Sequence, residues 1–337
     1  MTQQPTPRPP SPAGRPAVFV TQPIDETALT WLAGRADLRF GFGSAAERLA
    51  DVIEGVDGLL IRTEKLDAAL LRRARRLRVI CRVGVGLDNV DVAAASAARV
   101  PVFNTAGSNA RSVTELTFAL ALAVLRQIPR WDRAVREGRF ADREQDPGGE
   151  LSGKRWGIVG LGHIGVEVAR TARHGFGMEV LAYHPTRPAS WITERGAEAA
   201  LGLPDLLSRS DVVSLHVPRS AGTRNLLGPA QFAVMREGSV LVDVSRGGVV
   251  DEVALHEALA SGRLAGAGID VFAAEPPPDD DPLFALPNVV LSPHRAGRTR
   301  DATRRQGDLA VRRIVDVLGG AGAAGAVNEA EIGPGGA

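Results

Sequence analysis

The chain has 337 residues, a length that predicts two domains of roughly 150 residues each. Hydrophobic residues make up 44% and charged residues 23% of it, as in a globular protein with a buried core, and the net charge of +1 argues against nucleic acid or a membrane surface as a partner. The single cysteine, Cys81, excludes an internal disulfide, and no apolar run is long enough to span a membrane.

Both ends of the chain have a composition typical of disorder. Residues 1–15 are rich in Pro and lack the apolar stretch of a signal peptide, so the cytoplasm is the expected location. Residues 320–337 are rich in Gly and Ala. We therefore expect 1–15 and 320–337 to be disordered.

Short apolar runs alternate with helical segments along most of the chain, which is the pattern of a parallel α/β fold. Several runs are continuous stretches of Val, Ile and Leu, as in strands that are buried on both faces. The expected strands are Ala17–Val20, Gly58–Arg62, Arg78–Arg82, Arg155–Val159, Glu179–Tyr183, Asp211–His216, Ser239–Val244, Gly266–Val271 and Asn288–Leu291.

Two long helices are expected. The first runs from Ser112 to Ile128, because Ser112 and Glu115 have the spacing of a capping box and an apolar stretch follows. Residues 131–153 are polar and interrupted by Gly and Pro, so we expect an arm or linker there. The second helix spans about 298–318.

The clearest binding motif is a G-x-G-x-x-G sequence between an apolar strand and an amphipathic helix. Gly160 would permit the tight turn, Gly162 the approach of backbone N–H groups to a pyrophosphate, and Gly165 the close packing of helix on strand. His163 and Ile164 begin the helix, whose N-terminus favours phosphate. A dinucleotide site is predicted, and a tight turn without ligand is the alternative.

The strand after this motif ends at Tyr183 without the acidic residue that often binds the adenosine ribose about 20 residues on. His184 and Arg187 follow instead. Without that acidic residue, no negative charge at this position repels the 2′-phosphate of NADP. Arg187, helped by His184, could therefore bind this phosphate. Alternatively, Arg187 is a solvated loop residue and NAD binds, so both cofactors stay open.

Three polar segments that follow expected strands contain Arg246, Glu275 and His294. The carboxyl ends of parallel strands meet at one edge of a sheet, so these side chains are expected near one crevice. An imidazole can take or give a hydroxyl proton near neutral pH, and a carboxylate can orient it. A guanidinium can hold a substrate carboxylate in a bidentate fork.

These segments, the glycine motif and the run Arg82-Val-Gly-Val-Gly-Leu-Asp-Asn-Val-Asp91 resemble the D-2-hydroxyacid dehydrogenase family over about residues 17–318. Within it the chain is similar to the phosphoglycerate dehydrogenases and the hydroxypyruvate or glyoxylate reductases. The resemblance implies NAD(P)-dependent hydride transfer at the α-carbon of a small 2-hydroxy or 2-oxo acid, with Arg246, Glu275 and His294 catalytic. It also implies cofactor contacts from Val217, Pro218, Val244, Ser245, Asp270, His294 and Gly297, with Asp270 at the nicotinamide carboxamide.

The resemblance also implies a substrate site in the first half of the chain. Backbone N–H groups of the loop from Val83 to Gly86, those of Val83 and Gly84 among them, would bind the substrate carboxylate, and Asn109 lies where the chain would cross between domains. Arg62 and Arg82 match basic positions of the phosphoglycerate dehydrogenases, where a phosphate-bearing substrate would need them. Ordinary ion pairing of these two arginines is the alternative.

The implied architecture is two Rossmann-like, doubly wound parallel-sheet domains with a cleft between them. Residues 1–107 and 297–337 would form a flavodoxin-like substrate domain, and 108–296 the NAD(P)-binding domain. The helix from Ser112 and the arm after it resemble a homodimerisation element with Trp131 as a contact, although Trp131 could instead pack on its own helix. No metal site, nucleic acid or membrane partner is expected.

Two other functions stay open. Phosphite dehydrogenase resembles the family and uses the same three residue types, whereas formate dehydrogenases have Gln where Glu275 stands. The C-terminal-binding-protein corepressors share the fold and the three residues, but they act mainly as binding proteins that respond to nucleotides. The sequence leaves hydroxypyruvate, glyoxylate, 3-phosphohydroxypyruvate and bulkier 2-oxo acids as substrates.

Overall fold

The computed structural model describes residues 14–333, and the expectations for residues 1–13 and 334–337 lie outside that range. Within it the chain forms two compact units, residues 14–109 with 300–333 and Ala110–Thr299, here called the first and the second unit. No helix in the described range combines the length and the hydropathy that crossing a bilayer requires.

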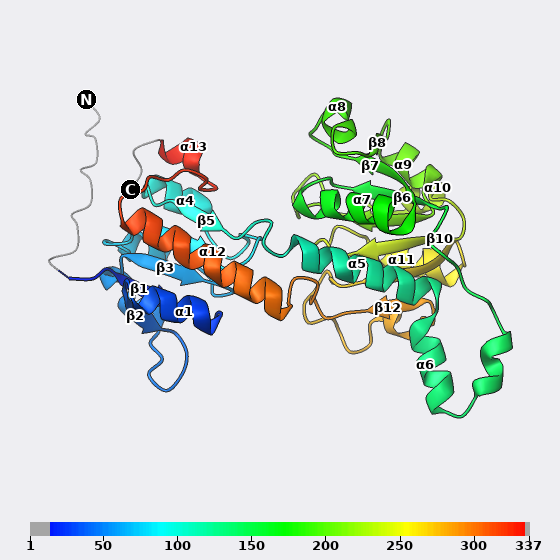
Figure 1. The fold of residues 1–337 in the computed structure, drawn as a ribbon, viewed down its shortest axis with the longest axis horizontal. Coiled ribbons are helices and arrows are strands. Elements are labelled where there is room, and N and C mark those ends of the chain that lie inside the picture. Colours follow the sequence, from blue (N-terminus) through cyan, green and yellow to red (C-terminus); the bar gives the residue numbers. More distant parts are fainter. Residues whose placement is uncertain (1–13, 334–337) are drawn as a thin grey trace. The chain divides into compact units, whose positions relative to one another are not determined.

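The first unit is built on a five-stranded parallel sheet with the order β2-β1-β3-β4-β5, the flavodoxin-like order (Figure 1). Its strands are β1 (Ala17–Val20), β2 (Asp37–Phe40), β3 (Gly58–Ile61), β4 (Val79–Arg82) and β5 (Val102–Asn104). Its helices are α1 (Glu26–Ala33), α2 (Leu49–Val52), α3 (Ala68–Arg73), α4 (Val92–Ala97), α12 (Arg300–Leu318) and α13 (Glu329–Ile332).

Alternate side chains of these strands pack on opposite faces of the sheet. Val18 and Val20 of β1 are buried in the cluster that includes Ile314 of α12. Phe19, between them, belongs to the opposite cluster with Ile80 of β4. Burial on both faces explains why these strands read as unbroken apolar runs.

The second unit contains a seven-stranded parallel sheet with the order β12-β11-β10-β9-β6-β7-β8. Its strands are β6 (Arg155–Val159), β7 (Glu179–Tyr183), β8 (Glu198–Ala199), β9 (Val212–Leu215), β10 (Ser239–Asp243), β11 (Leu264–Ile269) and β12 (Val289–Leu291). Its helices are α5 (Ala110–Leu125), α6 (Ile128–Arg136), α7 (His163–Phe176), α8 (Ala189–Thr193), α9 (Leu203–Arg209), α10 (Pro229–Val234) and α11 (Glu252–Ala260).

This sheet is also covered on both faces. Leu120 of α5 and Val168 of α7 pack on one side with Val242 of β10, whereas Leu255 of α11 packs on the other with Leu241. The strand order reverses between β6 and β9, and in open α/β sheets ligands bind at such a reversal, beyond the carboxyl ends of the strands. The predicted fold class of two doubly wound parallel-sheet domains is confirmed.

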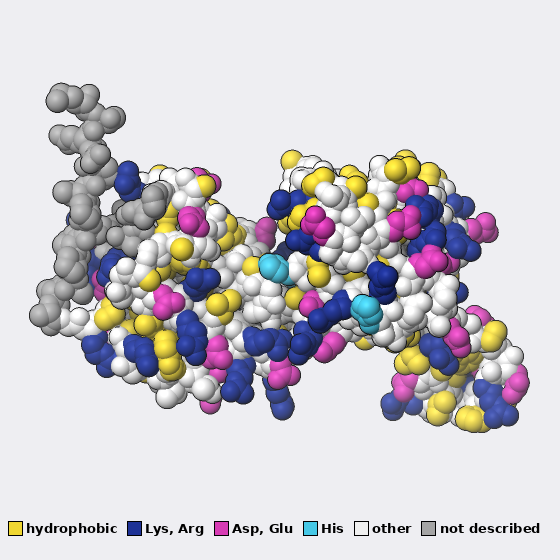
Figure 2. Space-filling model, turned by 45° about the horizontal axis from the view of Figure 1, so that its top comes forward, with side chains coloured by type: hydrophobic (Ala, Val, Ile, Leu, Met, Phe, Trp, Pro, Cys, Tyr) yellow, Lys and Arg dark blue, Asp and Glu magenta, His cyan; other side chains and the backbone are white. Residues whose placement is uncertain are grey.

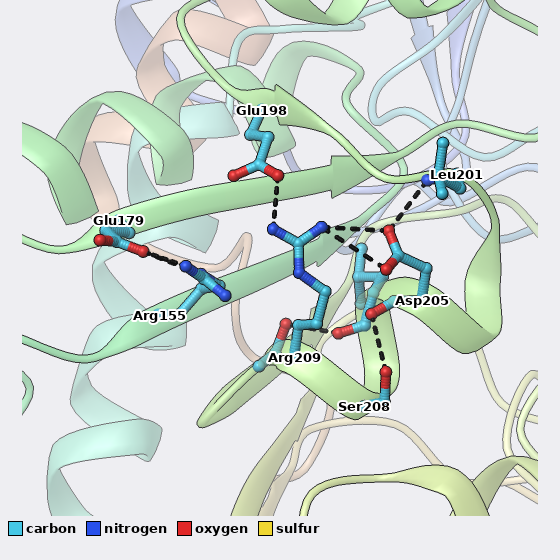
Figure 3. A network of polar contacts seen from close by, with 9 residues as sticks. Arg155, Glu179, Glu198, Leu201, Asp205, Ser208 and Arg209 are labelled. Atoms are coloured by element: carbon cyan, nitrogen blue, oxygen red, sulfur yellow. Dashed lines mark hydrogen bonds and ion pairs between the residues drawn. The ribbon is translucent and has the colours of Figure 1, made fainter.

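A polar network ties the outer strands of the second sheet together (Figure 3). The guanidinium of Arg209, at the end of α9, forms ion pairs with Glu198 of β8 and with Asp205 one helical turn earlier. Arg155 of β6 pairs in the same way with Glu179 of β7. Partly exposed ion pairs of this kind contribute little to the free energy of folding. The Arg209–Glu198 pair links the short edge strand β8 to α9.

The structure differs from the sequence-based expectations at several elements. Strands β2, β5 and β8 were not expected, because they have four, three and two residues and carry little apolar signal. The capping box at Ser112 is wrong: α5 begins at Ala110, and the buried Ser112 hydroxyl bonds Thr299 Oγ1 at 2.9 Å. The arm does not begin at Trp131, which lies inside α6.

The expectation of disorder is wrong for residues 320–333. Asn328 is fully buried there, its Oδ1 accepts the Val102 N–H of β5 at 2.9 Å, and its Nδ2 donates to Val100 O at 3.0 Å. Val327 N–H also donates to Val102 O at 2.7 Å. This segment therefore forms hydrogen bonds with the edge strand β5, as a sixth strand would. The Gly- and Ala-rich composition of the segment does not reveal this pairing.

Candidate active site

The glycine motif forms the turn between β6 and α7, at the reversal of strand order. Gly160 has a φ of +93°, and a Cβ there would lie 2.8 Å from the His216 carbonyl oxygen, just beyond β9. A Cβ at Gly165 would lie 2.2 Å from Gly160 O, so only glycine lets the helix pack this closely on the turn. Both positions exclude a larger residue for reasons of local geometry.

The start of α7 is open to a ligand. Gly162 is the N-cap, no side chain caps the helix, and a Cβ at Gly162 would meet no atom within 4 Å. His163 and Ile164 occupy the first turn, with His163 exposed. Uncapped N–H groups beside open space fit the pyrophosphate of a dinucleotide.

The other expected cofactor residues of this unit follow strands of the same sheet. His184 follows β7, Val217 and Pro218 follow β9, Val244 and Ser245 follow β10, Asp270 follows β11, and Gly297 follows the loop after β12. All strands are parallel, so these residues share the edge that carries the glycine turn. Val217, Val244 and Ser245 are buried at that edge.

Glu275 and His294 form a hydrogen-bonded pair beyond β11 and β12. His294 Nδ1 lies 2.8 Å from Glu275 Oε2 and 3.0 Å from Oε1, and Glu275 Oε1 also accepts the Phe272 N–H at 3.2 Å. The His294 side chain is 47% exposed, and the Glu275 side chain is 39% exposed. His294 has a φ of +50° and donates its N–H to Asp270 O at 2.8 Å.

Arg246 lies in the turn that follows β10. Its Nη1 donates to Ser245 O at 2.7 Å, and Ser245 donates both its N–H and its hydroxyl to Asp243 Oδ1 at 2.9 and 2.6 Å. Arg246 is half-buried, so part of its guanidinium remains open to a substrate. The predicted triad thus lies in one unit, at the carboxyl edge of one sheet.

The comparisons with known proteins decide the family. The family model described as D-isomer specific 2-hydroxyacid dehydrogenase, NAD binding domain, matches residues 118–296. A hydroxypyruvate reductase of Thermotoga maritima is 37% identical over 306 residues, which is 90% of this chain and 98% of that protein. The chain belongs to the D-2-hydroxyacid dehydrogenase family.

Two further relatives of this D-2-hydroxyacid dehydrogenase family member bear on its function. A D-3-phosphoglycerate dehydrogenase of Archaeoglobus fulgidus is 38% identical over 322 residues, and the chain spans only 60% of that protein's length. The crystal structure of an NADPH-dependent glyoxylate/hydroxypyruvate reductase from Sinorhizobium meliloti, in complex with NADP and malonate, matches with a TM-score of 0.80 at 29% identity, covering 95% of this chain and 98% of that chain.

Asp270, the expected contact of the nicotinamide carboxamide, lies directly after β11. It is fully buried, and its two carboxylate oxygens accept the N–H groups of Arg295 and Ala296 at 2.8 and 2.9 Å. Asp270 therefore holds the loop that carries His294.

In the first unit, Arg62 and Arg82 both lie at the carboxyl edge of the sheet. Arg62 follows β3 and Arg82 ends β4, the next strand of the sheet. The Arg82 guanidinium folds over Gly84, where a Cβ would lie 1.4 Å from Nη1. Asn109 is the last residue of the first of the two segments that form this unit.

In the loop from Val83 to Gly86, which was expected to bind the substrate carboxylate, the first two amides have partners within the protein. The Val83 N–H donates to Ile61 O and the Gly84 N–H to Thr105 Oγ1, each at 2.8 Å. Both amides are therefore already bonded. The next residues, Val85 and Gly86, are half-buried in the loop that Asn104 Nδ2 holds through Val85 O at 2.8 Å.

The loop after β7 places His184 and Arg187 around one aromatic ring. The His184 ring lies 5.4 Å from the Trp191 ring, and Arg187 Cζ lies 5.6 Å from the same centroid. Partial burial, and secondarily the charge of Arg187, lower the pKa of His184. The sequence did not single out Trp191, which orders this loop.

Sequence reasoning also missed two features beside the triad. An apolar pocket of about 430 Å³ adjoins Glu275 and His294, with Phe272, Phe284 and Leu291 in its wall. Asp243 is buried at the end of β10, where burial raises its pKa to about 7. The only sequence signal was a lone carboxylate at the end of an apolar strand.

Proposed function

We propose that the chain catalyses reversible hydride transfer between a nicotinamide dinucleotide and the α-carbon of a small D-2-hydroxy or 2-oxo acid. The observation that carries this proposal is the His294–Glu275 pair, with its 2.8 Å contact, at the same sheet edge as an uncapped glycine turn. The family membership and the relatives named above support it.

His294 moves the proton of this reaction. With Nδ1 bonded to Glu275, Nε2 is the nitrogen left for the substrate. In oxidation, Nε2 takes the hydroxyl proton as the α-carbon loses its hydride and the C–O bond becomes a carbonyl. In reduction, Nε2 returns that proton to the carbonyl oxygen. The Glu275 carboxylate orients the ring and stabilises its protonated form.

Arg246 holds the substrate in register with His294. A guanidinium binds a carboxylate through two parallel N–H bonds and can polarise the neighbouring carbonyl oxygen. Fixing the carboxylate also fixes which face of the α-carbon is presented for transfer. Bound NAD(P) would supply or accept the hydride, held by the turn from Gly160 to Gly165.

For the first unit we propose two binding roles. Within the loop from Val83 to Gly86, the N–H groups of Val85 and Gly86 are the candidates for binding the substrate carboxylate. Arg62 and Arg82, on neighbouring strands, supply positive charge for a phosphate or second carboxylate of the substrate.

We propose that Arg187 binds the 2′-phosphate of NADP. No acidic residue ends β7, and the guanidinium of Arg187 is positioned beside Trp191 by a cation–π contact. The structural relative that contains NADP supports this choice.

We also propose a homodimer formed through the arm, defined here as α6 with the 3₁₀ turn Phe140–Glu144. Ile128, Val135 and Phe140 of the arm are 55%, 60% and 62% exposed, and yellow side chains gather on the projecting segment at the lower right of Figure 2. Exposed apolar clusters of this kind mark contact surfaces. Trp131 is half-buried under Arg130, whose Cζ lies 4.5 Å from its ring.

A turnover assay tests the main proposal. The full chain would be mixed with NADH or NADPH and with glyoxylate, hydroxypyruvate or 3-phosphohydroxypyruvate, and loss of reduced cofactor followed by absorbance. We expect turnover that His294→Ala lowers by about 10²–10⁴-fold while cofactor affinity is kept. His174→Ala, an exposed residue at the far end of α7, is the matched control. Full activity of the His294→Ala variant would contradict the proposed function.

A further inference from the structure

Buried carboxyl groups lie at the ends of two neighbouring strands of the second sheet. Asp243 is the last residue of β10 and is 3% exposed, and Asp270 comes directly after β11 and is 0% exposed. The Asp270 N–H donates to Asp243 O at 2.9 Å, so the two residues are adjacent across the sheet. Burying a carboxyl group is unfavourable unless hydrogen bonds compensate for its lost contact with water. Both carboxyl groups accept such hydrogen bonds.

Each carboxyl group binds the loop that carries one catalytic residue. Asp270 accepts the N–H groups of Arg295 and Ala296 and thereby holds the loop of His294. Asp243 Oδ1 accepts two hydrogen bonds from Ser245, one from its N–H at 2.9 Å and one from its hydroxyl at 2.6 Å. Ser245 directly precedes Arg246.

The bonds of Ser245 continue to the guanidinium. The Ser245 carbonyl oxygen accepts Arg246 Nη1 at 2.7 Å, so Asp243 fixes the residue on whose backbone the guanidinium rests. The chain Asp243–Ser245–Arg246 is therefore continuous. A shift of Ser245 would move the group that is proposed to bind the substrate carboxylate.

The same loop is pressed against the Glu275 segment. A Cβ at Gly247 would lie 1.7 Å from the Phe272 carbonyl oxygen, so the two backbones touch at that point. The N–H of Phe272 donates to Glu275 Oε1 at 3.2 Å. The contact between Gly247 and Phe272 thus fixes the position of the Arg246 loop relative to the Glu275–His294 pair. Asp243 holds the Arg246 loop at this contact through its bonds to Ser245.

We propose that Asp243 is a positioning residue for Arg246, acting through Ser245, and that it governs 2-oxo acid binding without touching the substrate. This inference rests on the substrate-binding role proposed above for Arg246. Its hydrogen bonds require an acceptor oxygen at Oδ1 and no negative charge. A neutral carboxyl group, or the amide oxygen of asparagine, would therefore serve.

The electrostatic setting agrees with a group that works in the neutral form. Burial raises the pKa of Asp243 to about 7, against the opposing hydrogen bonds from Ser245. The charged groups that face it are Asp270 at the end of β11 and Glu252 at the start of α11, and both raise the pKa further. Near neutral pH, the carboxyl group therefore exists in both forms.

The test compares variants of the full chain by steady-state kinetics with glyoxylate and hydroxypyruvate. We expect Asp243→Ala to lower kcat/KM by about tenfold, mainly through KM, because Ser245 loses both bonds. Asp243→Asn keeps the acceptor oxygen and should stay within about threefold of the unmodified chain. Ser245→Ala, which loses only the hydroxyl, should fall between them. The affinity for reduced cofactor, measured by fluorescence, should be unchanged in Asp243→Ala and Asp243→Asn.

A double-mutant comparison shows whether Asp243 acts through Arg246. Added to Arg246→Ala, Asp243→Ala should cost little more, because the group it positions is already gone. An equal tenfold loss on that background would overturn the inference, as would an Asp243→Asn variant as impaired as Asp243→Ala. If Asp243→Ala does not fold, Ser245→Ala on both backgrounds gives the same comparison. If Arg246→Ala leaves KM unchanged, the proposed function fails instead.

Discussion

The imidazole Nδ1 of His294 lies 2.8 Å from Oε2 of Glu275, and this contact determines which nitrogen of the ring faces away to react. Because Glu275 Oε1 also accepts the Phe272 N–H, the carboxylate is held at its own backbone as well as at the imidazole. The pair is therefore a rigid unit within the loops that follow β11 and β12.

Glu275→Gln should separate the charge of this carboxylate from its geometry. Glutamine retains an acceptor oxygen, so the ring stays oriented, but the protonated imidazole loses its ionic partner. Charge-assisted hydrogen bonds are about twice as strong as neutral ones, so kcat should fall by about tenfold or more with little change in cofactor affinity. Glu179→Gln, at the exposed ion pair with Arg155, is the control. A Glu275→Gln enzyme with unchanged kcat would contradict the electrostatic role.

Arg187→Ala should reveal the cofactor preference. If Arg187 binds the 2′-phosphate, kcat/KM for NADPH should fall by about tenfold, and the value for NADH should change little. Arg195→Ala is a matched control, because Arg195 also stacks on Trp191, with Cζ 3.7 Å from the ring centroid. A parallel loss with both cofactors would instead indicate that Arg187 merely supports the loop.

Much of this site could be predicted from local sequence. Gly160 and Gly165 are required by a turn and a close helix contact that involve residues near them in the chain. Arg246, Glu275 and His294 follow apolar strands, and the edge rule for parallel sheets brings such residues together. Local pattern and global topology agree at these positions, which is why motif spacing was sufficient.

The features that could not be predicted have a common physical origin in hydrogen bonds made by distant residues. Whether the N–H of Gly84 is free depends on the Thr105 hydroxyl, and whether Asp270 is exposed depends on the amides of Arg295 and Ala296. The order of residues 320–333 depends on Asn328 bonding to the edge of β5. None of these partners is marked by sequence spacing.

Removing apolar side chains from the arm should weaken self-association. Val135→Ser combined with Phe140→Ser removes two exposed apolar groups from α6 and the turn after it, so the dimer dissociation constant should rise by about tenfold or more. Sedimentation velocity over a range of concentrations would measure it. Leu201→Ser, an exposed leucine elsewhere in the second unit, is the control. An unmodified chain that sediments as a monomer would rule out the proposed dimer.

The buried carboxyl group of Asp243 should make the folded state less stable as pH rises. Its pKa in the fold is about 7, above the ordinary value of 3.8 for this group, so the folded state favours the protonated form. The stabilisation is complete below about pH 3.8 and is lost as pH rises through 7. The urea midpoint of the unmodified chain minus that of Asp243→Asn should therefore fall as pH rises from 4 to 8.

His216 should give the opposite pH dependence in the same unit. It is half-buried beyond β9, its Nε2 lies 2.9 Å from Ser214 Oγ, and its Nδ1 has no hydrogen-bond partner within residues 14–333. Burial lowers its pKa from 6.5 to about 3, so the fold requires the neutral ring. The stabilisation is complete above pH 6.5 and is lost as pH falls towards 3, by about 1.4 kcal/mol for each pH unit.

Since the contributions of His216 and Asp243 have opposite signs between about pH 4 and 6.5, they partly cancel in the unmodified chain. His216→Gln should therefore make stability less sensitive to acid, and Asp243→Asn should make it more sensitive, when urea midpoints are compared at each pH. His174→Gln, on the exposed end of α7, should follow the unmodified chain. Parallel curves for His216→Gln and the unmodified chain would show that His216 accepts a proton in the folded state as readily as in the unfolded chain.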